Sequence, residues 1–350
     1  VNIQVALMPL LEKKVEMDEI VLQGLSLSLQ RNKEGRTNWD DLAKPPAAGK
    51  AEKKPEEQKA SEQAQLESIV IGGIRIEDAN ILWQDDQQGQ RYEIRSFNLV
   101  SGPLTQGDPV DIELNTAFVS GKPKVDGTLV LTAVIKADVE QAIYTLTDVN
   151  FTLEAAGETL PAEQLKVMLT ANPIVVKLNQ QAIDITGMDL SVDAKGKDLP
   201  GGAIKLTLTA NPVAVDLKQQ TLLVDALNLD TLGVNIKGAI KGQSITGDKP
   251  QFNGNMVIAE FNARDVMQQL GQEPPVTADN ATLTRVGASF DLAATTSSAA
   301  LVNLKARLDD TSLNGKLAVT DFASQAITFD LNLDEINLDR YLPPPAEGQA

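Results

Sequence analysis

The sequence contains neither cysteine nor histidine. Their absence excludes thiolate nucleophiles, cysteine or histidine metal sites, and catalytic triads that need an imidazole base. Without cysteine there is no disulfide framework either, so the redox compartment cannot be inferred directly from the sequence. We therefore expect a protein that is not an enzyme, with no catalytic residues, no bound metal and no cofactor.

Aromatic residues and basic residues are also scarce. Aromatic residues make up 4% of the chain, and 31 Lys and Arg stand against 48 Asp and Glu, for a net charge of −17. A chain this acidic repels phosphate backbones, so we expect no nucleic-acid partner. Two acidic pairs, Asp85-Asp86 and Asp309-Asp310, are interpreted as hairpin tips rather than calcium ligands.

Long apolar runs are missing as well, because no stretch approaches the roughly 18 apolar residues of a membrane span. The content of 42% hydrophobic and 23% charged residues is nevertheless that of a globular chain. Since the sequence begins at Val1 without a signal peptide, we expect a piece of a longer protein whose anchor or export signal lies outside it.

Composition divides the chain into three parts. Residues 44–67 are rich in proline, lysine and glutamate, which predicts a flexible insert. It separates an N-terminal unit with a strand and a short helix (1–43) from a β-rich body (68–345).

Most of the body is predicted to be β-strand. Residues 203–210 (AIKLTLTA) and 164–171 (QLKVMLTA) alternate apolar and polar side chains, which is typical of half-buried strands. The clearest helix signal follows Asn262, a capping residue, and ends before Gly271. We expect few and short helices.

A phrase of the sequence occurs twice. Residues 169–173 (LTANP) recur at 208–212, an interval of 39 residues, and residues 144–153 align with 183–192 at the same interval. A period of this length predicts tandem supersecondary units over about 130–240.

The Asn-Pro step interrupts the alternation in both copies. Apolar residues occupy even positions up to Ala210 and odd positions from Val213, and the same change of parity occurs at Asn172-Pro173 and near Gly187. One extra residue in a strand is a β-bulge, which keeps the apolar side on one face and bends the strand. The predicted fold class is mainly β, with long, bulged antiparallel strands in a curved, taco-like sheet that has an apolar groove.

Two interpretations of the apolar face remain open. It is either the core of an ordinary β-sandwich or similarly closed fold, or the lining of an open groove for an apolar ligand. Aliphatic side chains suit flexible acyl chains, whose transfer from water contributes about 0.8 kcal/mol per CH₂. The candidate lipid-binding residues are Leu165, Val167, Leu169, Ile174, Val176, Leu178, Ile204, Leu206, Leu208, Val213, Val215, Leu217, Leu317, Val319, Ile327, Phe329 and Leu331.

Several phrases of the chain resemble the AsmA family. In residues 21–42, Asn32, Gly35, Asn38, Trp39 and Leu42 match the phrase that opens proteins of this family. Residues 69–86, 261–286 and 313–344 are similar to later segments in the same order, so the resemblance covers about 20–344.

The resemblance implies a periplasmic protein anchored to the inner membrane by an N-terminal helix that this sequence lacks. It also implies kinship with TamB-like and chorein-like bridge proteins, which pass phospholipids along an aliphatic groove. We expect a protein that shields phospholipid acyl chains and supports lipid transport to the outer membrane and outer-membrane homeostasis. Phospholipids are the expected partners, and outer-membrane or periplasmic proteins are further candidates. The alternative is a structural or assembly factor for outer-membrane proteins or lipopolysaccharide that carries no lipid.

Overall fold

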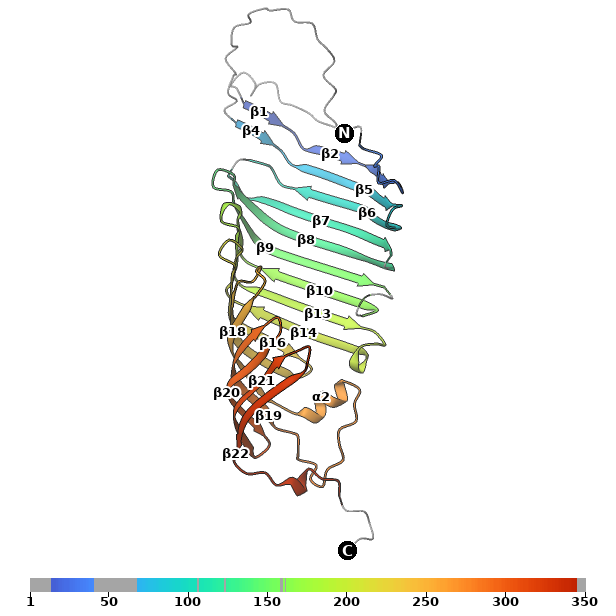
Figure 1. Cartoon of the computed structure of the whole chain (residues 1–350). Helices are drawn as coiled ribbons and strands as arrows, with labels where there is room; N and C mark the ends of the chain where they lie inside the picture. Colours follow the sequence, from blue (N-terminus) through green and yellow to red (C-terminus); the bar gives the residue numbers. More distant parts are fainter. Residues whose placement is uncertain are drawn as a thin grey trace, which may run out of the picture. The chain divides into compact units, whose positions relative to one another are not determined.

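The structure is a computed structural model that describes residues 14–40, 68–105, 107–122, 124–157, 160 and 162–344. The chain is mainly β, with long, bulged strands in a curved mixed sheet, which confirms the predicted fold class (Figure 1). Twenty strands share this sheet, and β1 and β4 form a separate parallel pair. The predicted insert at 44–67 lies outside the described residues.

The chain divides into two compact units. Unit 1 comprises Val1–Ala137 and Leu153–Leu160, and unit 2 comprises Asp138–Thr152 and Pro161–Ala350. The first eight strands are β1 (Lys14–Met17), β2 (Ile20–Gln23), β3 (Ser26–Arg31), β4 (Ser68–Ile71), β5 (Ile74–Asp85), β6 (Gln90–Ser101), β7 (Val110–Gly121) and β8 (Lys124–Asp138). Strand β9 (Ile143–Ala156) contributes residues to both units.

The later strands belong to unit 2. They are β10 (Gln164–Ala171), β11 (Ile174–Lys177), β12 (Ala182–Ile185), β13 (Met188–Lys195), β14 (Ala203–Ala210), β15 (Val213–Asp216), β16 (Thr221–Thr231), β17 (Val234–Gln243), β18 (Gln251–Phe261), β19 (Val286–Thr295), β20 (Ala299–Leu308), β21 (Thr311–Asp321) and β22 (Ala326–Leu333). Strands β10 and β14 have the predicted bounds.

Unit 1 departs from the predicted all-antiparallel pairing. Strands β5 to β8 pair antiparallel in chain order, but β2 and β3 both pair parallel to β5. Parallel strands need a long connection, and the residues between Arg31 and Ser68 supply one. The sequence patterns of the individual strands do not contain this pairing information.

In the first part of unit 2, a bulge divides each long strand into two shorter ones, which carry separate labels: β10 and β11, β12 and β13, β14 and β15. One half of the sheet pairs β10–β13–β14–β16, and the other pairs β9–β11–β12–β15–β16. From β16 to β22 each strand pairs antiparallel with the next (Figure 1). Strand β10 begins at Gln164 and β14 at Ala203, which is the 39-residue interval of the sequence repeat.

Helix α2 (Ala263–Gln269) confirms the predicted helix. The Asn262 side chain accepts hydrogen bonds from the N–H groups of Arg264 and Asp265, and Gly271 follows with φ of +72°. Three short 3₁₀ segments are η1 (Leu178–Gln180), η2 (Pro200–Gly202) and η3 (Leu338–Arg340). Among the described residues, no helix is long and apolar enough to cross a membrane.

The buried apolar residues mostly have small side chains. Among the described residues it consists of Ala79, Ala133, Val149, Ala155, Ala162, Ala171, Ala210, Met256 and Leu304. The largest side chains that are fully buried are polar: Thr282, Asp85 and Asp309. Leu, Ile, Val and Phe usually dominate the interior of a domain, so their near absence from the buried set means that most large aliphatic side chains lie on a partly exposed face.

Candidate functional site: a continuous aliphatic face

Cross-strand pairing aligns aliphatic side chains into rows in unit 2. Residues paired directly across neighbouring strands project from the same face of a sheet. The first row crosses ten strands from β10 to β22: Leu169, Leu190, Leu208, Leu229, Ile236, Ile258, Ala288, Ala306, Leu313 and Leu333. Every member is aliphatic, so the row forms an uninterrupted apolar line across the sheet.

Two more rows cross the other half of the strands. One consists of Leu146, Ile174, Ile185, Val213, Val224, Ile240, Gly254, Leu292, Leu301, Leu317 and Phe329. The next consists of Tyr144, Val176, Ile183, Val215, Leu222, Gly242, Phe252, Ala294, Ala299, Val319 and Ile327. Neither row contains a charged residue.

The bulges keep these rows on one face. Strand β17 has no bulge, and its Ile236 and Ile240 have the same parity, so they project from the same side. Their partners on β16, Leu229 and Val224, have opposite parity because the register shifts between Val224 and Leu227. The extra residue therefore restores the apolar side chains to the face that they would otherwise leave.

The Asn-Pro steps serve the same purpose. The Asn172 N–H donates to the Thr186 carbonyl at 3.1 Å, and the Thr186 N–H donates to the Pro173 carbonyl at 2.9 Å. Proline contributes only its carbonyl, so its missing N–H leaves no unpaired donor. Asn211-Pro212 makes the equivalent pair of hydrogen bonds with Asp225. The predicted change of parity at both Asn-Pro steps, which keeps the apolar side chains on one face, is confirmed.

The opposite face of the same strands is polar. The row beside the first aliphatic row reads Thr170, Asp189, Thr209, Asn228, Lys237, Val257, Ser289, Lys305, Asn314 and Asn332. Two ion pairs lie on this face: Lys177 Nζ is 2.7 Å from Asp184 Oδ2, and Lys205 Nζ is 3.6 Å from Asp193 Oδ1. The sheet thus has one aliphatic face and one hydrated face.

The structure brings nearly all the candidate lipid-binding residues into the aliphatic rows or beside them on the same face. The exceptions are Leu178, which begins η1 just beyond β11, and Leu217, which lies in the turn just beyond β15; they are 55% and 44% exposed. None of the candidates is buried. Their role in binding lipid stays a prediction.

Unit 1 carries a similar face, which the candidate residues did not include. One row crosses five strands through Leu22, Ile76, Leu99, Leu114 and Leu131. A second passes through Leu27, Ile81, Ile94, Phe118 and Gly127. A Cβ at Gly127 would come within 2.6 Å of Phe118 Cζ, so glycine leaves room for the neighbouring ring. The period-two alternation in residues 110–135 was a signal that could have identified Leu114, Phe118 and Leu131.

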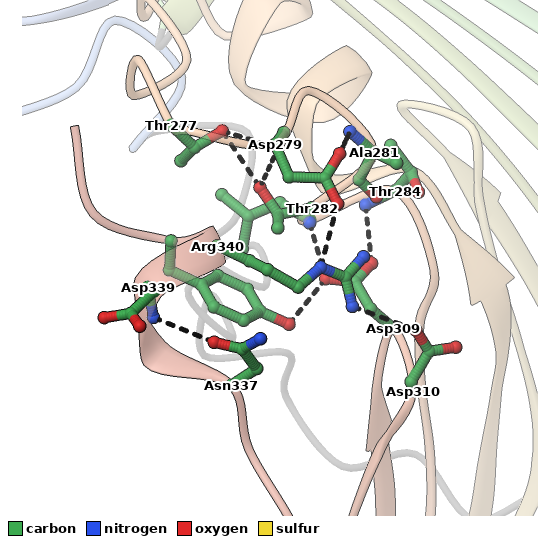
Figure 2. A network of polar contacts seen from close by, with 12 residues as sticks. Thr277, Asp279, Ala281, Thr282, Thr284, Asp309, Asp310, Asn337, Asp339 and Arg340 are labelled. Carbon is green, nitrogen blue, oxygen red and sulfur yellow. Dashed lines mark hydrogen bonds and ion pairs between the residues drawn. The ribbon is translucent and has the colours of Figure 1, made fainter. Parts of the chain in front are cut away.

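A polar network around the buried Asp309 joins the C-terminal segment of unit 2 to the loop after α2 (Figure 2). Asp309 is 1% exposed and accepts hydrogen bonds from the N–H groups of Leu283, Thr284 and Arg285 and from the Tyr341 hydroxyl. Burial alone would raise the pKa of Asp309, but these hydrogen bonds outweigh it and the pKa is lowered. Burial and the hydrogen bond to Asp309 raise the pKa of Tyr341 to about 12.

Arg340 completes this network. Its guanidinium lies between Asp279 Oδ2 at 2.8 Å and Asp310 Oδ2 at 3.0 Å (Figure 2). The carboxylates of Asp279, Asp309 and Asp310 all accept hydrogen bonds from groups of the chain itself, so the geometry of the network is that of a structural latch. Asp309 and Asp85 each lie at a hairpin end, as predicted, and Asp85 bonds to Arg31 and to the N–H groups of Gln87 and Gln88.

The phrase that resembles a known family forms a cap on strand β3. The Asn38 side chain accepts from the Gln30 N–H at 2.9 Å and donates to the Ser28 carbonyl at 2.8 Å. Gly35 adopts φ of +82° in the turn, and the rings of Trp39 and Trp83 are 5.3 Å apart. Leu42 lies outside the described residues.

The family model of the AsmA family matches residues 1–349, essentially the whole chain. The chain belongs to the AsmA family. This membership confirms the resemblance seen in the sequence, and it supports a role of this AsmA chain related to the periplasm and the outer membrane. No curated protein and no solved structure matches the chain.

Proposed function

We propose that this AsmA chain shields the acyl chains of phospholipids along its aliphatic face and so supports lipid transport from the inner to the outer membrane. The observation that carries the proposal is the ten-strand row from Leu169 to Leu333, which is aliphatic throughout while none of its members is buried. A face of this size that its own side chains do not bury gains from an apolar ligand.

The chemistry of the rows favours acyl chains over other apolar ligands. Their residues are mostly Leu, Ile, Val and Ala, with few rings for stacking on bases or sugars. Each CH₂ removed from water contributes about 0.8 kcal/mol, so a single acyl chain lying along several strands is held by many small contributions. The polar opposite face keeps such a complex hydrated.

We further propose that the protein works in the periplasm, anchored to the inner membrane by a helix outside this sequence, and has no enzymatic activity. Net movement of lipid then depends on a partner or a gradient. Outer-membrane or periplasmic proteins are the proposed partners besides phospholipid.

The test compares two neighbouring residues of β14 in cells. A photo-crosslinking amino acid replaces Leu208, which lies in the first row, or Thr207, which projects from the opposite face. We expect phospholipid adducts from Leu208 and none from Thr207, and native mass spectrometry of protein purified without detergent should show bound phospholipid. Equal adducts from both positions, or repeated lipid-free preparations, would contradict the proposal and favour an assembly factor that carries no lipid.

A further inference from the structure

Strand β22 is an exposed edge of the sheet in unit 2. It pairs with β21 alone among the residues that the structure describes, and all eight of its residues are exposed. Its apolar side chains are unusually open to solvent, with Ile327 61% and Phe329 70% exposed. An exposed, apolar edge strand is a template for pairing with another chain.

The free backbone groups of β22 belong to the residues that end the aliphatic rows. The Asp334 N–H donates to the Ser312 carbonyl, so the backbone of Asp334 points toward β21. Because backbone groups alternate along a strand, those of Leu333, Leu331, Phe329 and Ile327 point away from β21. An added strand would bond to these groups and extend the rows by one residue each.

Strand β3 in unit 1 has an edge whose backbone groups are hydrogen-bonded by a side chain instead of by another strand. The Asn38 side chain donates a hydrogen bond to the Ser28 carbonyl and accepts one from the Gln30 N–H. None of the residues that the structure describes covers β22 in this way. The strand also has neither the lysine nor the proline that commonly protects edges, and its one charged residue is Asp330.

Charge indicates what kind of strand fits. Residues 316–339 contain five acidic residues, Asp321, Asp330, Asp334, Glu335 and Asp339, against one basic residue, Lys316, whose Nζ lies 3.9 Å from Asp330 Oδ2. A second copy of β22 would bring the same acidic segment to the edge. Arg340 and Tyr341, which follow β22, are held elsewhere, since they bond to Asp279, Asp310 and Asp309.

We propose that β22 receives, by strand addition, an extended segment of another protein in which apolar residues alternate with lysine or arginine. The apolar residues continue the rows beyond Phe329 and Leu331, while the basic residues lie on the face of Asp330. This inference does not depend on what the aliphatic face binds, so its test is independent of the test for lipid transport.

The probe is a synthetic peptide that alternates valine with lysine, titrated onto the whole chain and followed by NMR and amide hydrogen exchange. We expect saturable binding and slower exchange at Phe329, Leu331 and Leu333. The control peptides alternate valine with glutamate or carry N-methyl groups on the backbone, and each should bind at least about tenfold more weakly. Absence of saturable binding by the lysine peptide, or equal binding by the controls, overturns the proposal.

A matched pair of variants tests the site. Leu331→Pro removes an N–H from the free edge without removing one from the β21 pairing, whereas Leu331→Val retains it. We expect about a tenfold loss of peptide affinity for the first and little change for the second, with circular dichroism confirming that both fold. Concentration-dependent self-association that Leu331→Pro abolishes would show a second copy at this edge and overturn the basic partner.

Discussion

At the scale of single residues, this chain uses asparagine to stabilise its bulges. Asp78, Ser96 and Asp148 adopt positive φ values of 51°, 46° and 50°. In each case the asparagine two residues later donates its side-chain amide to the carbonyl of that residue, at 3.1, 2.7 and 2.9 Å. The side chain thus fixes a backbone conformation that non-glycine residues adopt only at some cost.

The residue-scale prediction concerns Asn98. Its Oδ1 accepts from the Asp78 N–H at 3.0 Å, and its Nδ2 donates to the Ser96 carbonyl and to Asn115. We expect Asn98→Ala to lower the free energy of unfolding by about 1 to 2 kcal/mol, because each net hydrogen bond contributes about 1 kcal/mol. Urea unfolding checks this, with Asn98→Asp as the matched control that keeps the acceptor. A change of stability no larger in Asn98→Ala than in Asn98→Asp would show that the acceptor oxygen, which only Asn98→Asp retains, contributes nothing.

At the scale of elements, the C-terminal segment around η3 is held by side chains and by backbone hydrogen bonds from Ala278 and Asp279, without strand pairing. The hydroxyl of Tyr341 donates to Asp309 at 2.8 Å, and the guanidinium of Arg340 bridges Asp279 and Asp310. These partners come from segments distant in the chain, so the latch closes only when the sheet has formed.

The element-scale prediction is that this latch is weakened at both extremes of pH. The folded pKa of Asp309 is lowered, so its contribution is present above the unfolded value and is lost as pH falls through the folded pKa. The folded pKa of Tyr341 is raised from 10.0 to about 12, so its contribution is present below pH 10 and is lost as pH rises toward 12.

Tyr341→Phe and Asp309→Asn separate these two effects. We expect Tyr341→Phe to abolish the loss of protection above pH 10 in hydrogen exchange of the 334–344 amides, while leaving the acid side unchanged. We expect Asp309→Asn to cost on the order of 2 kcal/mol near neutral pH, because three backbone donors lose a charged acceptor. An alkaline loss of protection that persists in Tyr341→Phe would exclude the tyrosine as its cause.

At the scale of the whole molecule, large aliphatic side chains line one face of the sheet instead of filling an interior. This arrangement explains why the buried apolar set is mostly alanine. It also explains the regular bulges, since a long strand without them would turn half of its apolar side chains toward the hydrated face.

The prediction at this scale uses two adjacent residues of β14. Leu206→Lys introduces a charge into the aliphatic face, and Thr207→Lys introduces the same charge on the opposite face. If the face holds acyl chains, the first variant should retain at least about tenfold less phospholipid than the second, because an unpaired charge is strongly disfavoured in an apolar setting. Quantitative lipid extraction from detergent-free preparations measures this. Equal lipid content would place any bound lipid elsewhere.

The sequence by itself determined the local features of this protein. Strand limits at 164–171 and 203–210, the cap at Asn262 and the change of parity at each Asn-Pro step all follow from residues within a few positions of one another. Period-two alternation and side-chain capping are short-range effects, so one chain segment suffices to predict them. The AsmA family could likewise be identified from the sequence, because each matching phrase is a short contiguous segment.

Only the tertiary structure decided how these segments register with one another. The parallel pairing of β3 with β5, the alignment of aliphatic residues across ten strands, and the contact of Tyr341 with Asp309 join residues that are far apart in the chain. So does the exposure of β22, whose sequence alternates like that of its paired neighbours. Local patterns determine which side chains share a face of one strand, but hydrogen bonding between strands determines which residues meet across the sheet and which strand is left at its edge.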